Sequence, residues 1–302
     1  MVKIRVLIVR RIMCILYCWE EAFLDFLDRH NTKIQAVLHP LSMASLVSVI
    51  GFLFVYDMLY ALPELTDTQG LWYKLHCLWS IFAVYSIFSN LWVCFWTDTS
   101  VQALPEYRRR PHREEAHLWH YCPNCEIMVP PRAWHCRLCK VCCLKRDHHC
   151  TFTANCIGHL NQRYFLVFLF YGTLGSFQSL IYNFMYVWRT GAFIVADPFL
   201  ILSFGQPDRD PTIGSKVLAS MVLKVNLVAA MAAGGMFISQ LLMVYRNSTC
   251  FMMSDRTYDL GPMKNFRQVL GKRCLWTLLS VHINSPLPHD GTEWPMNKHT
   301  DV

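Results

Sequence analysis

The window from Cys122 to Cys156 concentrates the side chains of this 302-residue chain that could do chemistry. It holds eight cysteines and three histidines in 35 residues and contains the tetrapeptide Asp147-His148-His149-Cys150. Thiolates and imidazoles are the side chains that bind zinc, and a cysteine beside a histidine can act as a nucleophile. The window therefore predicts metal binding together with thiol chemistry.

The cysteines of this window recur at a metal-ligand spacing. The three Cys-x2-Cys pairs are Cys122 and Cys125, Cys136 and Cys139, and Cys139 and Cys142. At this spacing two thiolates can grip one tetrahedral ion, and the three histidines, His135, His148 and His149, can complete the ligand sets. Two closed sites need eight ligands, whereas the window offers eleven cysteine and histidine side chains. Three of these side chains are therefore not needed as ligands, and one of the three is expected to be the reactive residue.

Long apolar runs on either side must position this window. With 54% hydrophobic and only 16% charged residues, the chain is too apolar for an ordinary soluble domain. Each of four runs approaches or exceeds the roughly 20 residues that a membrane helix needs: Leu41–Tyr60, Leu75–Trp96, Phe165–Trp188 and Val217–Tyr245. The sequence predicts an all-α polytopic membrane protein with four transmembrane helices and a cytosolic zinc-bound cysteine-rich domain between helices 2 and 3. The charges of Asp57 and Lys224 are expected to snorkel outward from the ends of these runs.

The distribution of lysine and arginine predicts the orientation of the chain. Of these residues, 23 lie before the first run, between the second and third runs, or after the fourth, and only three lie in the other two connections. Because cytoplasmic loops retain positive charge, both termini and the cysteine-rich window are expected in the cytosol, where thiols stay reduced and disulfides are disfavoured. The net charge of +7 fits this topology and anionic lipid headgroups, and no nucleic-acid partner is expected. The predicted domains are a cytosolic N-terminal segment (1–36), transmembrane helices 1 and 2 (37–96), the cysteine-rich zinc domain (97–163), transmembrane helices 3 and 4 (164–245) and a cytosolic C-terminal tail (246–302).

These residues resemble the DHHC-type zinc-finger protein S-acyltransferases, usually called palmitoyltransferases. The likeness runs through Cys122-x2-Cys125, Pro131-Arg132, His135-Cys136-x2-Cys139-x2-Cys142, Asp147-His148-His149-Cys150, Asn155-Cys156-x-Gly158-x2-Asn161 and Phe165. The four-run layout and the tail segments Tyr258-Asp259-Leu260-Gly261 and Lys264-Asn265-Phe266, then Gly271, extend it over most of the chain. The stretch Ser285-Pro286-Leu287-Pro288 resembles the branch that contains the mammalian member numbered 24.

The resemblance implies two structural zinc ions and a cysteine nucleophile. One ion would take Cys122, Cys125, His135 and Cys142, and the other would take Cys136, Cys139, His149 and Cys156. Family precedent makes Cys150 the nucleophile. The residue types then suggest roles for its neighbours, because His148 can accept the thiol proton and Asp147 can fix the tautomer of the imidazole.

The implied reaction moves a long fatty acyl group from an acyl-coenzyme A such as palmitoyl-CoA. The group passes through a Cys150 thioester to cytosol-facing cysteines of membrane-associated proteins, at the lipid surface of an endomembrane such as the Golgi or endoplasmic reticulum. The residues expected to contact substrate are Phe152, Phe165, Phe168, Gly175 and Asn265. Gly175 is expected to leave depth for a long chain, and close helix packing is the alternative role. Asn265 is expected to dock the tail, with a solvated loop asparagine as the alternative.

Two departures from the family pattern leave an alternative function open beside the favoured enzyme. Thr151-Phe152 stands where relatives carry Pro-Trp, and Ser248-Thr249-Cys250-Phe251 stands where relatives carry Thr-Thr-x-Glu. A polar tie between the tail and the zinc segment is therefore expected to be absent. The alternative is a catalytically weak or inactive relative that acts as a zinc-braced membrane scaffold. A transporter or channel is disfavoured because the apolar runs lack a line of ionisable residues.

Overall fold

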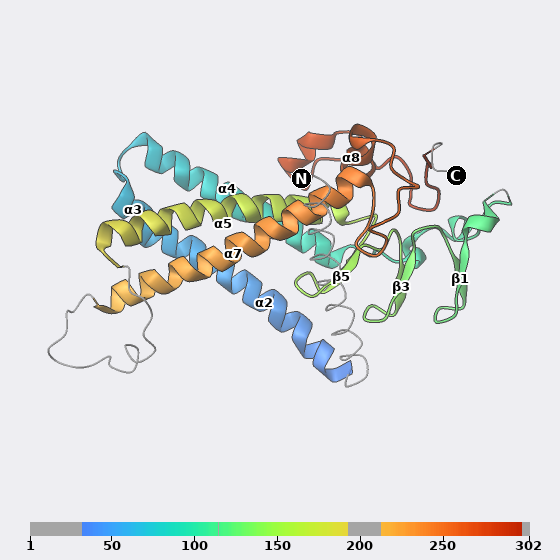
Figure 1. Cartoon of the computed structure of the whole chain (residues 1–302), viewed down its shortest axis with the longest axis horizontal. Helices are drawn as coiled ribbons and strands as arrows, with labels where there is room; N and C mark the ends of the chain where they lie inside the picture. The colour runs from blue at the N-terminus through green and yellow to red at the C-terminus, as the bar shows by residue number, and fades with distance from the viewer. Residues whose placement is uncertain (1–31, 114, 193–212, 298–302) are drawn as a thin grey trace, which may run out of the picture. The chain divides into compact units, whose positions relative to one another are not determined.

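The structure is a computed structural model that describes residues 32–113, 115–192 and 213–297. The predicted N-terminal segment 1–36 lies mostly outside this part of the chain. Figure 1 shows the chain coloured from blue at the N-terminus to red at the C-terminus, with its helices and three of its strands labelled.

Four long helices dominate the described residues, and all four predicted runs fall within them. α2 (Thr32–Tyr56) continues through a π-helical turn (Asp57–Ala61) into α3 (Leu62–Leu65), and the other long helices are α4 (Leu71–Trp96), α5 (Gln162–Thr190) and α7 (Ile213–Arg246). Each is long and apolar enough to cross a membrane. Large apolar side chains such as Leu78 and Ile81 are exposed on them, as the surface of a lipid-facing helix requires. The prediction of four such helices is confirmed.

The chain divides into two compact units, and the division falls inside each long helix. Of the described residues, one unit contains 32–45, 89–113, 115–167 and 238–297, and the other contains 46–88, 168–192 and 213–237. The first will be called the Cys/His unit and the second the helical unit. All sixteen predicted site residues except Phe168 and Gly175 belong to the Cys/His unit.

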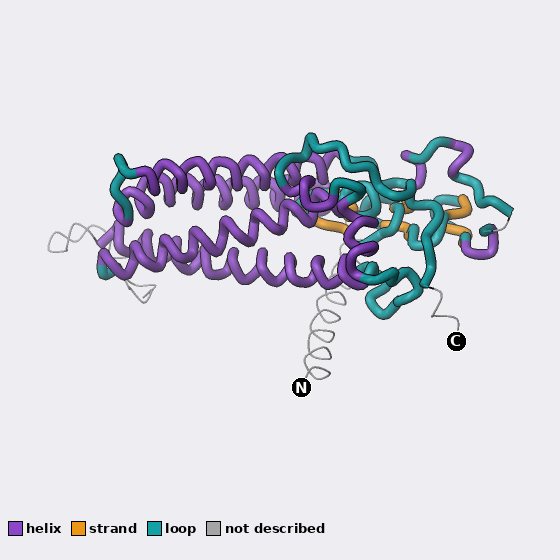
Figure 2. Tube along the Cα trace, turned by 90° about the horizontal axis from the view of Figure 1, so that it is seen from above, coloured by secondary structure: helices purple, strands orange, loops and turns teal. Residues whose placement is uncertain are grey.

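The cysteine-rich segment forms three small hairpins, so the prediction of an all-α fold is wrong for this part of the chain. The antiparallel pairs are β1 (His120–Cys122) with β2 (Ile127–Val129), β3 (Trp134–Cys136) with β4 (Val141–Cys143), and β5 (His148–Cys150) with β6 (Asn155–Ile157). They are the short orange strands of Figure 2. In the first two hairpins the turn closes over a Cys-x2-Cys pair. The next residue, Glu126 or Lys140, has positive φ, and its N–H donates to the carbonyl of the first cysteine. The ligand spacing itself thus makes a tight turn between two strands.

Hydrogen bonds join the third hairpin to the end of α4. The Asn155 side-chain amide donates to the carbonyl oxygens of Cys94, Phe95 and Thr97 at 2.9, 3.3 and 2.8 Å. These carbonyls lie in the last turn of α4 or just beyond it, where no helical N–H remains to satisfy them. Asn155 therefore caps α4 from the cysteine-rich segment and explains why the helix ends at Trp96.

A close backbone approach in the same segment requires glycine. A Cβ on Gly158 would lie 2.5 Å from the carbonyl oxygen of Leu144, closer than any side chain can come. The Asn161 side chain accepts a hydrogen bond from the N–H of Gly158 at 2.9 Å, and α5 begins at the next residue. The β6 strand is thereby fixed to the start of α5.

The remaining elements of the Cys/His unit are short. They are the 3₁₀ turns Val101–Ala103, Glu106–Arg108, Ala116–Leu118 and Cys274–Leu278, and the helix α8 (Pro262–Leu270). Asn265 on α8 is fully buried. Its amide donates to the Tyr245 carbonyl (2.8 Å) and to Asp259 Oδ1 (2.7 Å), and its oxygen accepts from the Leu260 N–H (3.0 Å). These bonds hold α8 against the end of α7.

Inside the helical unit, polar side chains pair across the helices. Asp57 is buried and accepts a hydrogen bond from Asn183 Nδ2 at 2.6 Å. The expectation that Asp57 snorkels outward is therefore wrong, because a partner on α5 stabilises its carboxyl group inside the helices. Gly175, also on α5, packs near Ile87: a Cβ added to it would lie 3.9 Å from Ile87 Cδ1, an ordinary contact distance.

Candidate active site and metal clusters

The first Cys/His cluster brings together Cys122, Cys125, His135 and Cys142. Their ligand atoms all lie within 4.8 Å of one another. Cys125 Sγ is 3.2 Å from His135 Nδ1, and Cys142 Sγ is 3.7 Å from Cys125 Sγ. The first two hairpins supply these four residues, so the cluster also fastens one hairpin to the other.

The second Cys/His cluster brings together Cys136, Cys139, His149 and Cys156, again with all ligand atoms within 4.8 Å of one another. His149 Nδ1 lies 3.6, 3.3 and 3.8 Å from the sulfurs of Cys136, Cys139 and Cys156, in that order. The other ring nitrogen, Nε2, lies 3.2 Å from His39 Nε2 on α2. A metal-bound histidine usually donates its second ring N–H to an acceptor, and an unprotonated nitrogen of His39 can fill that place and fix the tautomer. His39 was not predicted from the sequence.

Both clusters have the dimensions of a tetrahedral metal site. Metal–sulfur bonds of about 2.3 Å place two sulfurs of a tetrahedron about 3.8 Å apart. The Sγ–Sγ separations are 3.7 Å between Cys142 and Cys125 and 3.6 Å between Cys139 and Cys156. Three thiols and one imidazole are a donor set that suits zinc. Each cluster could therefore hold one metal ion.

Strand β5 positions the residues that these clusters leave over. Residues two apart on a strand point to the same face, so His148 and Cys150 share one face while the ligand His149 points to the other. Cys150 is only 4% exposed. The third leftover residue, Cys143, is buried in a small apolar cluster with Cys136 and Cys156. A thiol and an imidazole are therefore adjacent and outside both metal clusters.

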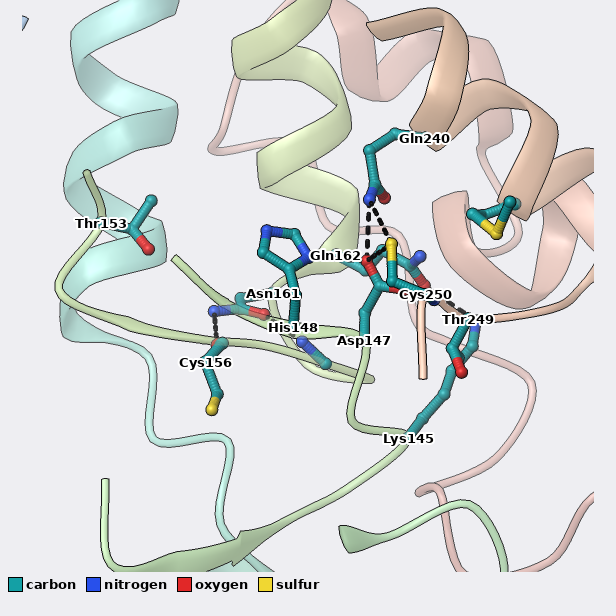
Figure 3. A network of polar contacts seen from close by, with 12 residues as sticks. Lys145, Asp147, His148, Thr153, Cys156, Asn161, Gln162, Gln240, Thr249 and Cys250 are labelled. Carbon is teal, nitrogen blue, oxygen red and sulfur yellow. Dashed lines mark hydrogen bonds and ion pairs between the residues drawn. The ribbon is translucent and has the colours of Figure 1, made fainter. Parts of the chain in front are cut away.

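Asp147 orients this imidazole and is itself held by several donors (Figure 3). His148 Nδ1 lies 2.8 Å from Asp147 Oδ2, and Gln240 Nε2 donates to the same oxygen at 2.8 Å. The backbone N–H of Cys250 donates to Asp147 Oδ1 at 2.6 Å. His148 Nε2 is buried and has no hydrogen-bond partner among the described residues. The imidazole thus has one nitrogen on the carboxylate and one available for proton exchange.

The electrostatics of the site favour a charged carboxylate, imidazolium and thiolate. Burial alone would raise the pKa of Asp147, but hydrogen bonds from His148, Cys250 and Gln240 lower it to about 2. Burial opposes protonation of His148, yet its bonds to Asp147 and its interaction with Cys150 raise its pKa well above the usual value. Burial likewise opposes ionisation of Cys150, and His148 lowers the pKa of that thiol. Such a histidine-paired cysteine is the form that attacks as thiolate.

Sequence reasoning missed Gln240 and misjudged the segment after α7. The expected absence of a polar tie between the tail and the zinc segment is wrong. The backbone amide of Cys250 makes that tie to Asp147, so it does not depend on a glutamate side chain. Gln240 lies 93 residues from Asp147 in sequence, and no local signal marks it as a partner.

A second tie runs through a buried arginine in the likeness signature. The Arg132 guanidinium lies over the rings of Tyr258 and Trp294, 4.6 and 4.4 Å from their centroids. It also donates to Asn247 Oδ1 (3.1 Å) and to the Asn247 carbonyl (2.7 Å). Buried cation–π contacts of this kind stabilise a fold by about 2 kcal/mol or more. Arg132 therefore attaches two parts of the C-terminal tail to the cysteine-rich segment.

Two histidines complete this tail contact. His159 and His289 stack with their rings 4.9 Å apart, and Trp294 packs edge-on against both. Burial lowers the pKa of His159 to about 3 and that of His289 to about 4, and the nearby cation Lys145 adds to both shifts. Both rings are therefore neutral in the folded tail at neutral pH.

The residues predicted to contact substrate are distributed over both units. Phe165 is buried and lies edge-on to His148, with ring centroids 5.2 Å apart, whereas Phe152 is 41% exposed. Phe168 and Gly175 belong to the helical unit, and Asn265 lies in α8 with its amide bonded as described above. Phe165 is thus in contact with the histidine beside Cys150.

Comparison with known proteins gives a consistent family match. Residues 115–258 match the family model described as DHHC palmitoyltransferase. Similar proteins include "Probable protein S-acyltransferase 14" of Arabidopsis thaliana, 30% identical over 60% of this chain and 58% of the relative. They also include "Probable palmitoyltransferase ZDHHC24" of Homo sapiens (30% identical, 57% of this chain, 63% of the relative) and "Palmitoyltransferase ZDHHC22" of Mus musculus (31%, 54%, 63%). The chain spans about three fifths of the length of these relatives.

Proposed function

We propose that this chain, which carries a DHHC palmitoyltransferase domain, is a membrane-bound protein S-acyltransferase. It moves a long fatty acyl group from acyl-CoA, through a thioester on Cys150, to cysteines of membrane-associated proteins. One observation carries the proposal: His148, bonded to a buried and multiply bonded Asp147, shares a strand face with a thiol that neither Cys/His cluster uses. A purely structural metal module has no need for that arrangement.

The first half-reaction follows from the state of this pair. The Cys150 thiolate attacks the thioester carbonyl of the acyl-CoA, forming a new carbon–sulfur bond as the bond to coenzyme A breaks. His148 holds the proton that Cys150 gave up, and Asp147 stabilises the resulting imidazolium. Gln240 and the Cys250 amide keep the carboxylate in place. His148 then gives the proton it holds to the coenzyme A thiolate as it leaves. In the second half-reaction the acceptor thiol gives its proton to the neutral His148 and attacks the carbonyl of the Cys150 thioester. The new carbon–sulfur bond replaces the bond to Cys150, which leaves as the thiolate.

One thioester replaces another in both steps, so little driving force is needed. The contribution of the protein is then mainly to bring a thiolate and an acyl chain together in the correct geometry. For the acyl chain we keep the sequence-based proposal that Phe152, Phe165, Phe168 and Gly175 line its path. The contact between Phe165 and His148 supports the start of that path.

The metal in this proposal is structural. The first Cys/His cluster would hold one zinc ion and the second Cys/His cluster another, and each ion would cross-link the short hairpins. Because His149 lies between His148 and Cys150 on β5, the second cluster would also fix the strand that presents the reactive pair.

The membrane arrangement supports the same function. The four apolar helices and the bias of lysine and arginine favour a multi-pass protein with both termini and the Cys/His unit on the cytosolic side. Acyl-CoA and cysteine-bearing protein acceptors would then meet at a lipid surface. We place the protein in an endomembrane, Golgi or endoplasmic reticulum, and retain the sequence-based domain boundaries at 36/37, 96/97, 163/164 and 245/246.

The test is acyl loading of purified, detergent-solubilised protein. It is incubated with alkyne-tagged palmitoyl-CoA, and hydroxylamine-sensitive label is read by intact mass. Cys150→Ser should abolish the label. Cys274→Ser, which removes a half-buried thiol of the tail, should retain it. If folded, metal-loaded wild type takes no label, the enzyme proposal fails and the membrane scaffold becomes the better reading.

A further inference from the structure

A third group of metal-binding side chains lies at the reactive pair itself. Ligand atoms of Asp147, His148 and Cys250 all lie within 4.8 Å of one another. Asp147 Oδ2 is 2.8 Å from His148 Nδ1 and 3.7 Å from Cys250 Sγ. Figure 3 shows the Cys250 sulfur beside the Asp147 carboxylate, on the side where Gln240 approaches. The reaction proposed above uses the backbone amide of Cys250 and leaves its thiol without a role.

The donor set suits a borderline metal ion such as zinc. It contains one carboxylate oxygen, one imidazole nitrogen and one thiol sulfur, the three donor types that zinc accepts. With ordinary zinc–ligand bond lengths, the edges of a tetrahedron through such atoms are about 3.3 to 3.6 Å. The 3.7 Å separation between Asp147 and Cys250 already fits, and the 2.8 Å separation between Asp147 and His148 must widen by about half an ångström.

The third group also differs from the two closed clusters. Each closed cluster offers four protein ligands, whereas this group offers three. A three-ligand site leaves its fourth position to water and binds metal less tightly than a closed structural site of comparable ligands. Ligation would release the thiol proton of Cys250 and the Nδ1 proton of His148 to solvent. Zinc would therefore bind here reversibly, above the concentration that fills the closed clusters.

We propose that Asp147, His148 and Cys250 form a third, reversible zinc site whose occupation inhibits acyl transfer. An ion on His148 takes the position of the proton that the imidazole shares with Asp147. It replaces the 2.8 Å contact by which Asp147 orients the imidazole, so the ring no longer keeps its position beside Cys150. The inhibitory consequence rests on the proposed function, whereas the binding of the ion does not.

The binding test uses the full-length protein in detergent without acyl-CoA. Bound zinc per chain is measured by elemental analysis across a series of buffered free-zinc concentrations, for wild type, Cys250→Ser and the control Cys274→Ser. Cys250→Ser keeps the backbone N–H that Asp147 needs and removes the soft sulfur ligand. We expect a third equivalent of zinc in wild type and in Cys274→Ser, and two equivalents in Cys250→Ser. Peptide mapping should show that zinc protects Cys250 from alkylation in the same concentration range.

The inhibition test measures palmitoyl-CoA loading in the same zinc series, with each variant normalised to its own rate at low zinc. Loss of the Cys250 thiol ligand should raise the zinc concentration that gives half-inhibition by about tenfold or more. Mutations around a metal site commonly weaken metal affinity by about 10- to 100-fold. Cys250→Ala, which also keeps the N–H, should behave like Cys250→Ser.

The two tests separate failure of this proposal from failure of the enzyme function. Two equivalents in every variant, or equal inhibition of all of them, overturns the third site. A third equivalent that depends on Cys250, in protein that never takes up acyl label, supports the zinc site and contradicts the acyltransferase function.

Discussion

Replacing Asp147 by asparagine removes the charge of the carboxylate that holds the reactive histidine. Asp147 Oδ2 faces His148 Nδ1 and Gln240 Nε2, both at 2.8 Å, and Oδ1 faces the Cys250 N–H at 2.6 Å. Asparagine keeps one acceptor oxygen and adds two N–H donors. In either orientation of the asparagine amide, its NH₂ group faces N–H donors that previously bonded to a carboxylate oxygen. These donors are His148 and Gln240 in one orientation and the Cys250 N–H in the other.

The expected cost can be worked from these contacts. Hydrogen bonds to charged groups contribute about 1.5–3 kcal/mol each. The least costly orientation keeps the oxygen toward His148 and Gln240, which weakens two charged bonds to neutral ones and loses the bond from Cys250. We expect about 3–4 kcal/mol less stabilisation of the imidazolium. At about 1.4 kcal/mol per factor of ten, acylation should slow by roughly 10²- to 10³-fold.

The assay is single-turnover acylation of Cys150 by saturating palmitoyl-CoA, followed by rapid quench and intact mass. Asp67→Asn, in the exposed loop between α3 and α4, makes the same chemical change far along the chain and should leave the rate unchanged. Zinc content is measured in parallel to show that both Cys/His clusters remain filled. A rate for Asp147→Asn within tenfold of wild type, at full zinc content, would refute the view that this carboxylate stabilises the imidazolium.

Three further perturbations test neighbouring parts of the structure. Gln240→Leu removes one donor to the buried carboxylate and should slow acylation about 10- to 100-fold, from 1.5–3 kcal/mol for one charged hydrogen bond; an unchanged single-turnover rate contradicts its positioning role. Removing metal with a chelator should open residues 97–163 to protease, because the hairpins then lose their cross-links; protection that persists after complete metal loss, measured by limited proteolysis, contradicts the structural role of zinc. The pKa values of His159 and His289 lie below the unfolded value of about 6.5, near 3 and 4. The unfolded tail therefore binds more protons, so the docked tail is fully stable above about pH 6.5 and weakens as the pH falls toward 4. Hydrogen exchange of the tail that is constant from pH 7 to 4.5, after correction for the intrinsic rate, would contradict this.

Local sequence was sufficient for the Cys-x2-Cys pairs and the helices, because each depends on near neighbours or on composition, whereas the division of the cysteines and histidines into two ligand sets came from the family resemblance. Two of the three Cys-x2-Cys pairs, Cys122 with Cys125 and Cys136 with Cys139, each close a tight turn. An uncharged run of about 20 residues has a strong tendency to be a membrane helix. The same locality holds for the pairing of Asp147 with His148, whereas the strand that places His148 and Cys150 on one face came from the structure. The hairpins themselves were missed because strands of three residues are too short to show an alternating pattern.

Tertiary structure decided which distant groups complete the site. Gln240 and Cys250 lie 93 and 103 residues from Asp147, and His39 lies 110 residues from His149. No sequence motif or spacing relates these three residues to their partners. Gln240 lies within an apolar helix, Cys250 follows that helix, and His39 lies near the start of another helix. The family resemblance predicted that no tie to Asp147 exists, because a motif compares side-chain types and the family's glutamate is missing here. Cys250 makes the tie with its backbone N–H, a group that every residue except proline possesses. Contacts between residues that are close in sequence can be predicted from the sequence. Contacts between backbone and side-chain groups that are far apart in sequence form only when the chain folds, so only the tertiary structure shows them.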